Sequence, residues 1–248
     1  MKKKKVYNVQ VRSFSPGVNL LFNILIALFA ISCVIPFIFV VIISLTNEQS
    51  LAANGYSFWP EKFSFAAYQY IFAGDMSKKI FQSFGVTVFI TVVGTLVNAS
   101  MTSLYAYAIS RSNFPFRKFF TVFALITMLF TPGMVANYLV VTNLLNMQDT
   151  ILALILPLAL GPFNILVMRT FFKKTIPDSI IESARIDGAS EMKIFMSIVL
   201  PLAVPGIATI SLFAALGYWN DWFNALLYIQ KDELVPLQYL LMRIMNNL

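Results

Sequence analysis

The sequence predicts an all-α fold, a polytopic bundle of membrane-spanning helices, and two observations carry this prediction. Of the 248 residues, 58% are hydrophobic and only 12% are charged, whereas about a quarter of the residues in a soluble domain are charged. The mean hydropathy is +0.76, and the apolar residues gather in long runs that approach the ~20 residues needed to cross a bilayer. A membrane β-barrel would show short alternating segments instead. The composition also excludes a disordered or collagen-like chain.

Five apolar runs are read as spans, and the region 20–222 as the transmembrane domain that contains them. They cover residues 20–45, 84–109, 119–141, 151–171 and 202–218. The first run follows a basic segment and so invites comparison with a signal peptide. It is longer than the 7–15 apolar residues of a signal peptide, and no small-residue cleavage site follows it. We therefore expect an uncleaved span.

The basic residues predict the orientation of these spans. With the amino end inside the cell, 13 of the 18 Lys and Arg residues fall on the inner side, as do four of the 11 acidic residues. An excess of Lys and Arg in short inner segments is the usual topology signal. The lysines at positions 2–5 are interpreted in this way, as part of a cytoplasmic segment at 1–19. The loop at 172–201 is then also cytoplasmic, and the segment 223–248 is an outer loop.

Two kinds of site are not expected in this chain. The sequence has no His and a single Cys, Cys33, so a zinc site is not expected and a disulfide within the chain is impossible. It also has no Gly-x-x-x-x-Gly-Lys-Ser/Thr loop to cradle a triphosphate. No cofactor is therefore expected in this chain, and no metal.

The inner loop at 172–201 carries the strongest local signals. Pro177 suits a first helical position and Gly188 suits the residue just past a helix end, which predicts a helix over 177–187. Ser190 can cap a second helix with Glu191 in its first turn, and Pro201 is expected to end that helix. The same pattern would suit a generic amphipathic surface loop. The length of the segment favours a lever that transmits a partner's movement into the membrane.

This loop resembles the EAA loop of ABC-importer permeases, in the carbohydrate branch similar to the maltose-type proteins. The matching residues are Glu182-Ser-Ala-Arg-Ile-Asp-Gly-Ala189, then Phe195, Ile198, Leu200, Pro201 and Pro205. Ser183 departs from the pattern, which has Ala there. Asn137-Tyr138 and Tyr218-Trp-Asn-Asp-Trp222 also resemble this branch. The segments 54–60 and 144–150 resemble a Gram-positive subgroup linked to complex or acidic oligosaccharides.

The resemblance implies a non-enzymatic subunit of an ATP-driven sugar importer in a bacterial cell membrane. Its implied partners are a second homologous permease, two cytoplasmic ABC ATPases that bind ATP and Mg, a solute-binding lipoprotein and an oligosaccharide. The residues implied in coupling to the ATPase are Glu182, Ser183, Ala184, Arg185, Asp187, Gly188 and Ala189. Such permeases usually have six spans, so the resemblance also predicts truncation before a sixth span.

Helix breaks point to the translocation pathway, because freed backbone groups at membrane depth need water or protein around them. Pro132-Gly133 interrupts the third run, and Pro157 and Gly161-Pro162 interrupt the fourth. The pathway candidates are Asn137, Tyr138, Asn164, Trp219, Asn220, Asp221 and Trp222. An interfacial aromatic belt is the alternative for the Trp residues, and interhelical hydrogen bonding for Asn164. The candidates for contact with the receptor are Tyr228, Gln230 and Gln238.

Other functions were weighed against this one. A membrane-embedded enzyme would need a catalytic constellation, but the chain has no His and no paired carboxylates within its spans. A structural subunit without a conduit would not need the broken third and fourth spans. A permease for a solute other than sugar remains the main alternative.

Overall fold

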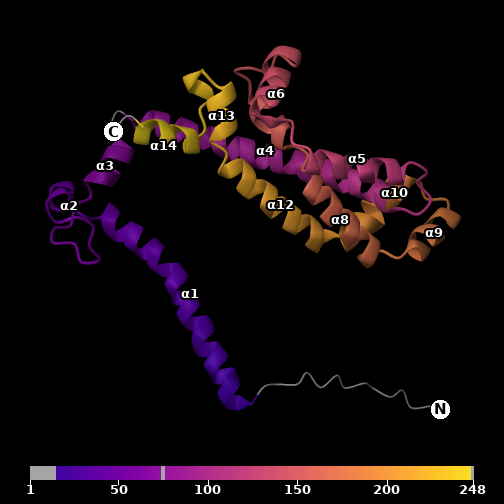
Figure 1. The fold of residues 1–248 in the computed structure, drawn as a ribbon, viewed down its shortest axis with the longest axis horizontal. Helices are drawn as coiled ribbons and strands as arrows, with labels where there is room; N and C mark the ends of the chain where they lie inside the picture. Colours follow the sequence, from indigo (N-terminus) through magenta and orange to yellow (C-terminus); the bar gives the residue numbers. More distant parts are fainter. Residues whose placement is uncertain (1–14, 74–75, 247–248) are drawn as a thin grey trace. The chain divides into compact units, whose positions relative to one another are not determined.

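The computed structural model describes residues 15–73 and 76–246, which divide into two compact units, 1–77 and 78–248 (Figure 1). The lysines at 2–5 and Arg12 lie outside the described residues. Helices make up both units, and the described residues add one isolated antiparallel bridge, between Thr46 and Phe63. Long apolar runs fold into helices because a helix forms all the hydrogen bonds of its backbone internally, and the bilayer core holds no water to form them instead.

The first unit contains one long helix followed by a small cap. α1 (Pro16–Ser44) has 29 residues and no buried side chain, which suits a helix about 44 Å long that faces lipid. It begins within the segment 1–19 that was expected to precede the span. α2 (Glu48–Asn54) and α3 (Ala66–Ala73) follow. The Ser44 and Tyr68 hydroxyls share a 2.9 Å hydrogen bond that ties α3 to the end of α1.

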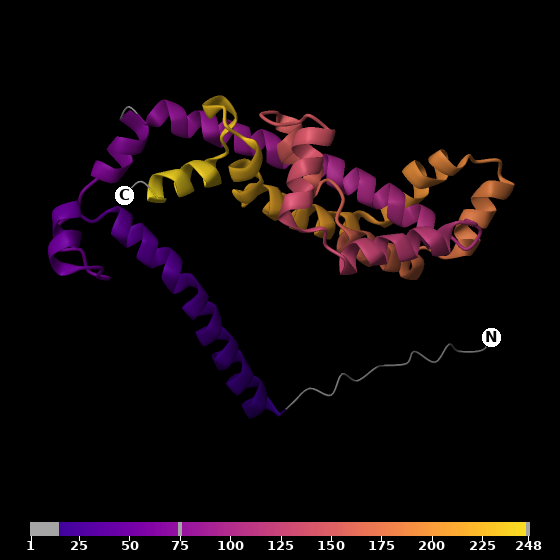
Figure 2. The same ribbon diagram turned by 45° about the horizontal axis from the view of Figure 1, so that its top comes forward.

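Four helices run along the second unit. They are α4 (Ser77–Ser110), α5 (Arg117–Leu129), α8 (Pro162–Thr175) and α12 (Val204–Trp219). α5 packs on α8 and α8 on α12, and α4 runs beside them (Figures 1 and 2). Met168, Phe172, Val199 and Ile210 are fully buried in the main core between these helices and the inner loop.

Two of the five predicted spans are bent, and a third bend lies where the inner loop meets the fifth span. α5 and the segment Gly133–Leu144 (α6, Gly133–Leu139, and a π-helical turn) meet at 116°. The segment Ile151–Leu158, which begins with α7 (Ile151–Ile155), meets α8 at 50°, and Glu191–Leu202 meets α12 at 82°. Among the described residues, two single helices are long and apolar enough to cross a membrane, and up to five spans result if each bent pair counts as one. The breaks predicted at Pro132-Gly133 and at Gly161-Pro162 are confirmed, and Gly133 has a φ of +82° that favours glycine.

The break in the fourth span is filled by side chains from other helices. The Tyr218 hydroxyl donates to the Ile155 carbonyl at 2.8 Å, and the Asn98 amide donates to the Leu158 carbonyl at 2.8 Å. These are carbonyls that an unbroken helix would satisfy internally. The approach of Tyr218 needs Gly94, because a methyl group there would lie 2.5 Å from the tyrosine ring.

The loop and the tail lie at opposite ends of the second unit (Figure 1). One end, the loop end, holds α9 (Asp178–Ile186), α10 (Glu191–Ile194), a π-helical turn and α11 (Leu200–Leu202). The other end holds α13 (Phe223–Tyr228) and α14 (Leu237–Asn246). The segment 223–248, expected as an outer loop, therefore contains two helices that pack on the bundle.

Two local expectations about proline were wrong. Pro177 is the cap before α9, with an extended ψ of 141°, and not its first helical residue. Pro201 lies inside a helical segment that continues to Leu202. The π-helical turn Phe195–Val199 directly precedes it. This wider turn leaves room for a proline ring, which would clash with a regular α-helical carbonyl.

Candidate functional site

α9 is attached to the bundle by one face and exposed on the other. Ile181 and Ala184 are buried in the main core. Glu182 and Asp187 are exposed. Ala184 therefore packs mostly within the chain. Ile186, which is not among the predicted coupling residues, is 86% exposed. In the sequence it is marked only by being apolar at a position away from the buried face of the helix.

A glycine turn reverses the chain after α9. The Ala189 amide donates to the Ala184 carbonyl at 3.0 Å, and the Gly188 amide to the Arg185 carbonyl at 2.9 Å. This is the Schellman arrangement, which needs a left-handed residue, and Gly188 has a φ of +79°. No atom lies within 4 Å of a methyl group placed on Gly188, so backbone conformation alone requires glycine. The Ser190 hydroxyl then caps the second helix, as predicted, by accepting from the Lys193 amide at 3.4 Å.

Arg111, at the end of α4, binds both sides of the junction between α8 and α9. Its side chain is 4% exposed. The guanidinium donates to the carboxylate of Asp178 at 3.2 Å and to the carbonyls of Phe172 and Ile176 at 3.4 and 3.5 Å, and Nε donates to the Ser110 hydroxyl at 2.9 Å. In the sequence, Arg111 is only one of the basic residues that predict the topology. A cation that caps one helix end and pairs with the start of the next fixes the angle between them.

A second polar cluster joins α9, α10 and α4. The Arg185 guanidinium contacts Glu191 Oε1 at 2.6 Å, and the Tyr107 hydroxyl donates to Glu191 Oε2 at 3.1 Å. The side-chain oxygen of Asn113 accepts a hydrogen bond from the Arg185 guanidinium. The hydrogen bond from Arg185 holds the pKa of Glu191 below its ordinary value, with a smaller contribution from Tyr107. Arg185 therefore acts within the chain, and the cluster secures both loop helices to α4.

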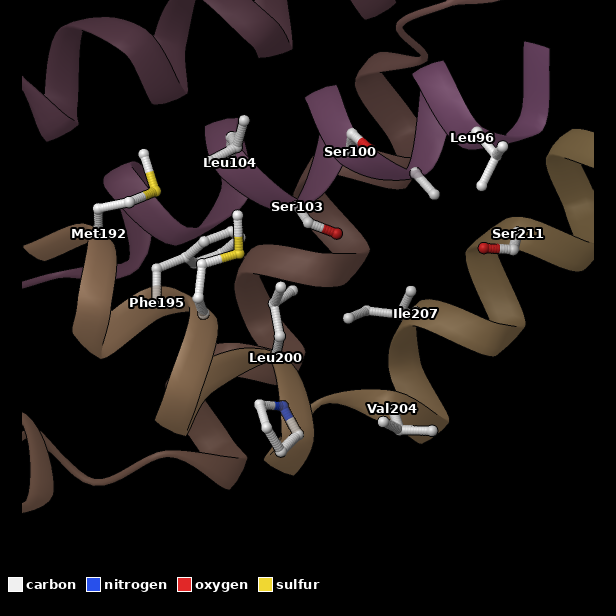
Figure 3. Close-up of a pocket in the computed structure, with 13 residues that line it drawn as sticks. Leu96, Ser100, Ser103, Leu104, Met192, Phe195, Leu200, Val204, Ile207 and Ser211 are labelled. Atoms are coloured by element: carbon white, nitrogen blue, oxygen red, sulfur yellow. The ribbon is translucent and has the colours of Figure 1, made fainter. Parts of the chain in front are cut away.

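An apolar groove of about 680 Å³ separates the second loop helix from part of α4. Leu104 lies on one side, Phe195 and Leu200 on the other, with the hydroxyls of Ser103 and Ser211 directed toward the space (Figure 3). The two helices are thus joined at the Glu191 cluster and separated beside it.

At the opposite end, Asp149 ties the turn after α6 to the tail. Its carboxylate accepts from the amides of Gln230 at 2.5 Å and Lys231 at 3.0 Å, and its own amide donates to the Tyr228 carbonyl at 3.0 Å. Hydrogen bonds from these two backbone amides lower the pKa of Asp149. Its φ of +57° is one that Asp tolerates better than most residues. No local pattern in the sequence marks Asp149, because its partners lie about 80 positions away.

The predicted pathway residues do not form one cluster. Asn137 is exposed on α6, and Asn164 is half-buried in the first turn of α8. Tyr138 stacks on Tyr228, with ring centroids 6.2 Å apart. Within residues 15–73 and 76–246, no hydrogen bond joins Asn164 to Asn137.

The aromatic segment after α12 forms a corner of the fold. The Trp219 ring meets Phe84 edge-on at 6.1 Å, and the Asn220 amide donates to a carbonyl of its own helix. Asp221 caps α13 by accepting from the backbone and side-chain amides of Asn224 at 3.1 and 2.7 Å. Trp222 is exposed. Asp221 and Asn220 thus make hydrogen bonds within the fold, and Trp222 is left as the exposed aromatic side chain of this group.

The three predicted receptor contacts differ in exposure. Gln230 is exposed and Gln238 is half-buried. Tyr228 is 1% exposed, so its side chain cannot serve as a surface contact; it packs with Val141 and Ala153 in a small core. The apolar run that contains Tyr228 belongs to the folded bundle and not to an extended loop.

The helices and the loop together define an α-helical integral membrane protein with a two-helix loop at one end. Residues 99–247 match the model of the family described as "Binding-protein-dependent transport system inner membrane component". The chain belongs to this family of transport permeases. The resemblance of the loop at 172–201 is thereby confirmed at the level of the family.

The similar proteins include sugar permeases of the same kind. The chain is 42% identical to the polygalacturonan/rhamnogalacturonan transport system permease protein YtcP of Bacillus subtilis (strain 168), over 91% of this chain and 79% of that protein. It is 40% identical to protein LplC of the same organism, over 85% of this chain and 70% of that protein. Its fold matches a crystal structure of a bacterial ABC transporter involved in the import of the acidic polysaccharide alginate. That match has a TM-score of 0.84 and 28% identity, and covers 95% of this chain and 84% of that chain.

Proposed function

We propose that this chain is a membrane subunit of an ATP-driven importer of oligosaccharides, with the loop end in the cytoplasm. It would form half of the translocation pathway beside a second homologous permease. The sugar permeases among its relatives support the substrate class. The alginate importer and the polygalacturonan permease favour a complex or acidic oligosaccharide.

The observation that carries the coupling role is the two-sided character of α9. Its inner face is buried at Ile181 and Ala184, while Ile186 is 86% exposed beside the exposed carboxylates of Glu182 and Asp187. An apolar side chain ringed by polar groups is typical of an anchor in a protein interface. We infer that this face docks into a separate ATPase chain. That chain would bind ATP and Mg, since no phosphate-binding loop occurs here.

Movement of α9 would reach the membrane through its polar connections to α4 and α8. Arg111 and the Glu191 cluster connect the loop to the ends of these helices. The adjoining 680 Å³ groove leaves one side of the second loop helix unpacked against α4, although its other side is buried in the main core. Rigid-body shifts of packed elements are a usual way of passing a conformational change between sites. This chain supplies position and packing to transport, and the hydrolytic chemistry belongs to its partner.

Receptor contact would occur at the other end of the second unit. Gln230 and Trp222 are exposed there, and the hydrogen bonds of Asp149 hold the backbone at Gln230 in place. An aromatic face and an amide suit the apolar faces and hydroxyl edges of sugars. The same groups would serve a solute-binding lipoprotein that delivers its sugar at this surface.

The coupling role is tested by changing the exposed face of α9. The variant Glu182→Arg/Ile186→Ser should retain the fold of the chain and lose binding to the ATPase, with uptake by the reconstituted transporter reduced at least about tenfold, as for loss of an interface anchor. Lys193→Gln, an exposed residue of the second loop helix, is the control. Assembly and uptake equal to the control would show that α9 is not the docking element.

A further inference from the structure

A second concave site lies at the loop end, and no residue of α9 lines it. It has a volume of about 340 Å³ and is formed where the end of α4, the start of α5 and the end of α8 meet. Four of its lining residues are basic: Arg117 and Lys118 from α5, and Arg169 and Lys173 from α8. The proposed coupling mechanism uses none of these side chains.

This basic pocket has no counter-charge of its own. No Asp or Glu lines it, and the four salt bridges found in the described part of the chain involve other cations. Arg169 is held in position by a hydrogen bond from Nε to the Ile109 carbonyl, at 3.3 Å. Four like charges around one concavity repel one another, and an anion bound between them removes that repulsion.

The surface next to the pocket is apolar. Val122 lines the pocket itself, and further along α5 the side chains of Phe123, Ile126 and Leu129 are 52%, 48% and 67% exposed. The polar end of α5 thus continues into an apolar face that runs toward the middle of the predicted span. A ligand that matches both parts has an anionic head and hydrocarbon chains.

We propose that the basic pocket binds the phosphate headgroup of an anionic phospholipid, whose acyl chains lie along α5. Basic pockets between helices at a membrane surface are suited to such headgroups. A basic topology signal needs only charge on the correct side of the membrane. Beyond charge, these residues form a concavity between three helices, and a concavity has room for one bound molecule. The inference depends on the membrane placement of the second unit and is independent of ATP coupling.

The test uses the full chain within its assembled transporter, purified from vesicles of phosphatidylcholine with phosphatidylglycerol and analysed by native mass spectrometry. Lys118→Gln/Lys173→Gln removes two exposed charges that make no hydrogen bond in the described structure. We expect roughly tenfold less retained phosphatidylglycerol, since each basic residue near a membrane surface contributes to anionic lipid binding. The matched control is Lys78→Gln/Lys231→Gln, which removes two exposed charges at the opposite end.

Further arms separate the lipid from other anions and partners. Inorganic phosphate and glycerol 3-phosphate at millimolar concentration should leave the bound phosphatidylglycerol in place, because they lack acyl chains. Displacement by either would overturn the proposal in favour of a free-anion site. Equal retention in the variant and the control would also overturn it. Normal lipid retention in the variant, combined with loss of ATPase binding, would also overturn the proposal and would assign the two lysines to a protein contact.

Discussion

Single polar residues hold the loop of this permease at a fixed angle to its helices. Arg111, 4% exposed, pairs with Asp178 at 3.2 Å. Loss of a partner from a buried polar group costs about 1–3 kcal/mol, although Asp178 is half exposed, which weakens this ion pair. The bonds from Arg111 to the carbonyls of Phe172 and Ile176 are less open to solvent. The buried carbonyl contacts therefore stabilise this junction together with the half-exposed salt bridge.

Gly188 is predicted to be essential through its backbone alone. Gly188→Ala should cost about 1–2 kcal/mol, because a left-handed conformation is unfavourable for alanine, and should lower transport by loosening the turn between the loop helices. Gly217→Ala is the control, since it also adds a methyl group in open space, at a helical position without positive φ. Uptake and thermal unfolding of both variants provide the measurement. Equal behaviour of the two variants would contradict the role of the turn.

Asp149 should make the attachment of the tail dependent on pH. Its pKa is lowered in the folded chain from an ordinary value of 3.8. Its contribution to stability is therefore fully present above that value and is lost as the pH falls through the folded pKa. The difference in Tm between the wild type and Asp149→Ala should be present at pH 7 and should close as the pH drops below about 4.

Asp187→Ala serves as the control for this titration, because Asp187 is exposed and its side chain makes no hydrogen bond in the described structure. Its Tm difference from the wild type should be small across the same range. A gap for Asp149→Ala that stays constant down to pH 3 would show that the carboxylate charge does not hold the tail.

At the scale of elements, the break in the fourth span is a packed joint. Its two freed carbonyls accept from Tyr218 and Asn98 on two neighbouring helices. The sequence left two environments possible for these groups, water or protein, and the structure assigns protein to both carbonyls. The bend of 50° is therefore fixed by α4 and α12.

Gly94→Ala tests this joint. The added methyl group would overlap the Tyr218 ring, which should displace the ring, break its hydrogen bond to Ile155 and destabilise the bundle by about 1–3 kcal/mol. Gly85→Ala lies on the same helix in open space and should be neutral or slightly stabilising. Thermal unfolding of the two purified variants in detergent compares them directly. A Tm for Gly94→Ala at or above that of Gly85→Ala would exclude the close approach.

At the scale of the whole second unit, α4 connects the two ends. Its 34 residues correspond to about 50 Å at helical rise. Near its start the Thr87 hydroxyl accepts from the Leu237 amide at 2.8 Å, at the first turn of α14. Near its end Tyr107 contacts Glu191 of the loop. One helix therefore contacts both the proposed receptor surface and the proposed lever.

Thr87→Val is predicted to weaken communication between these ends. The substitution keeps the shape of the side chain and removes the acceptor for Leu237, so stimulation of ATP hydrolysis by sugar-loaded receptor should fall severalfold, while basal hydrolysis stays unchanged. Thr209→Val is the control, because that exposed hydroxyl bonds only within its own helix. ATPase assays on the reconstituted transporter measure both rates. Full stimulation in Thr87→Val would rule out α4 as the connection through this contact.

The sequence by itself determined the features that depend on near neighbours. Apolar runs predicted the spans, and the glycine turn at Gly188 and the Ser190 cap followed from a few adjacent residues. The resemblance of Glu182 through Pro201 to the EAA loop indicated the family before any coordinates.

Only the tertiary structure decided which polar groups meet. Arg111 and Asp178 are 67 positions apart, and Asp149 and Gln230 are 81 apart; no local pattern encodes such pairs. The same holds for the burial of Tyr228, the 116° bend after α5 and the basic pocket between three helices. Hydrophobic periodicity and capping act within a few turns of chain, whereas these features arise from the packing of distant helices, which brings together groups that the sequence keeps apart.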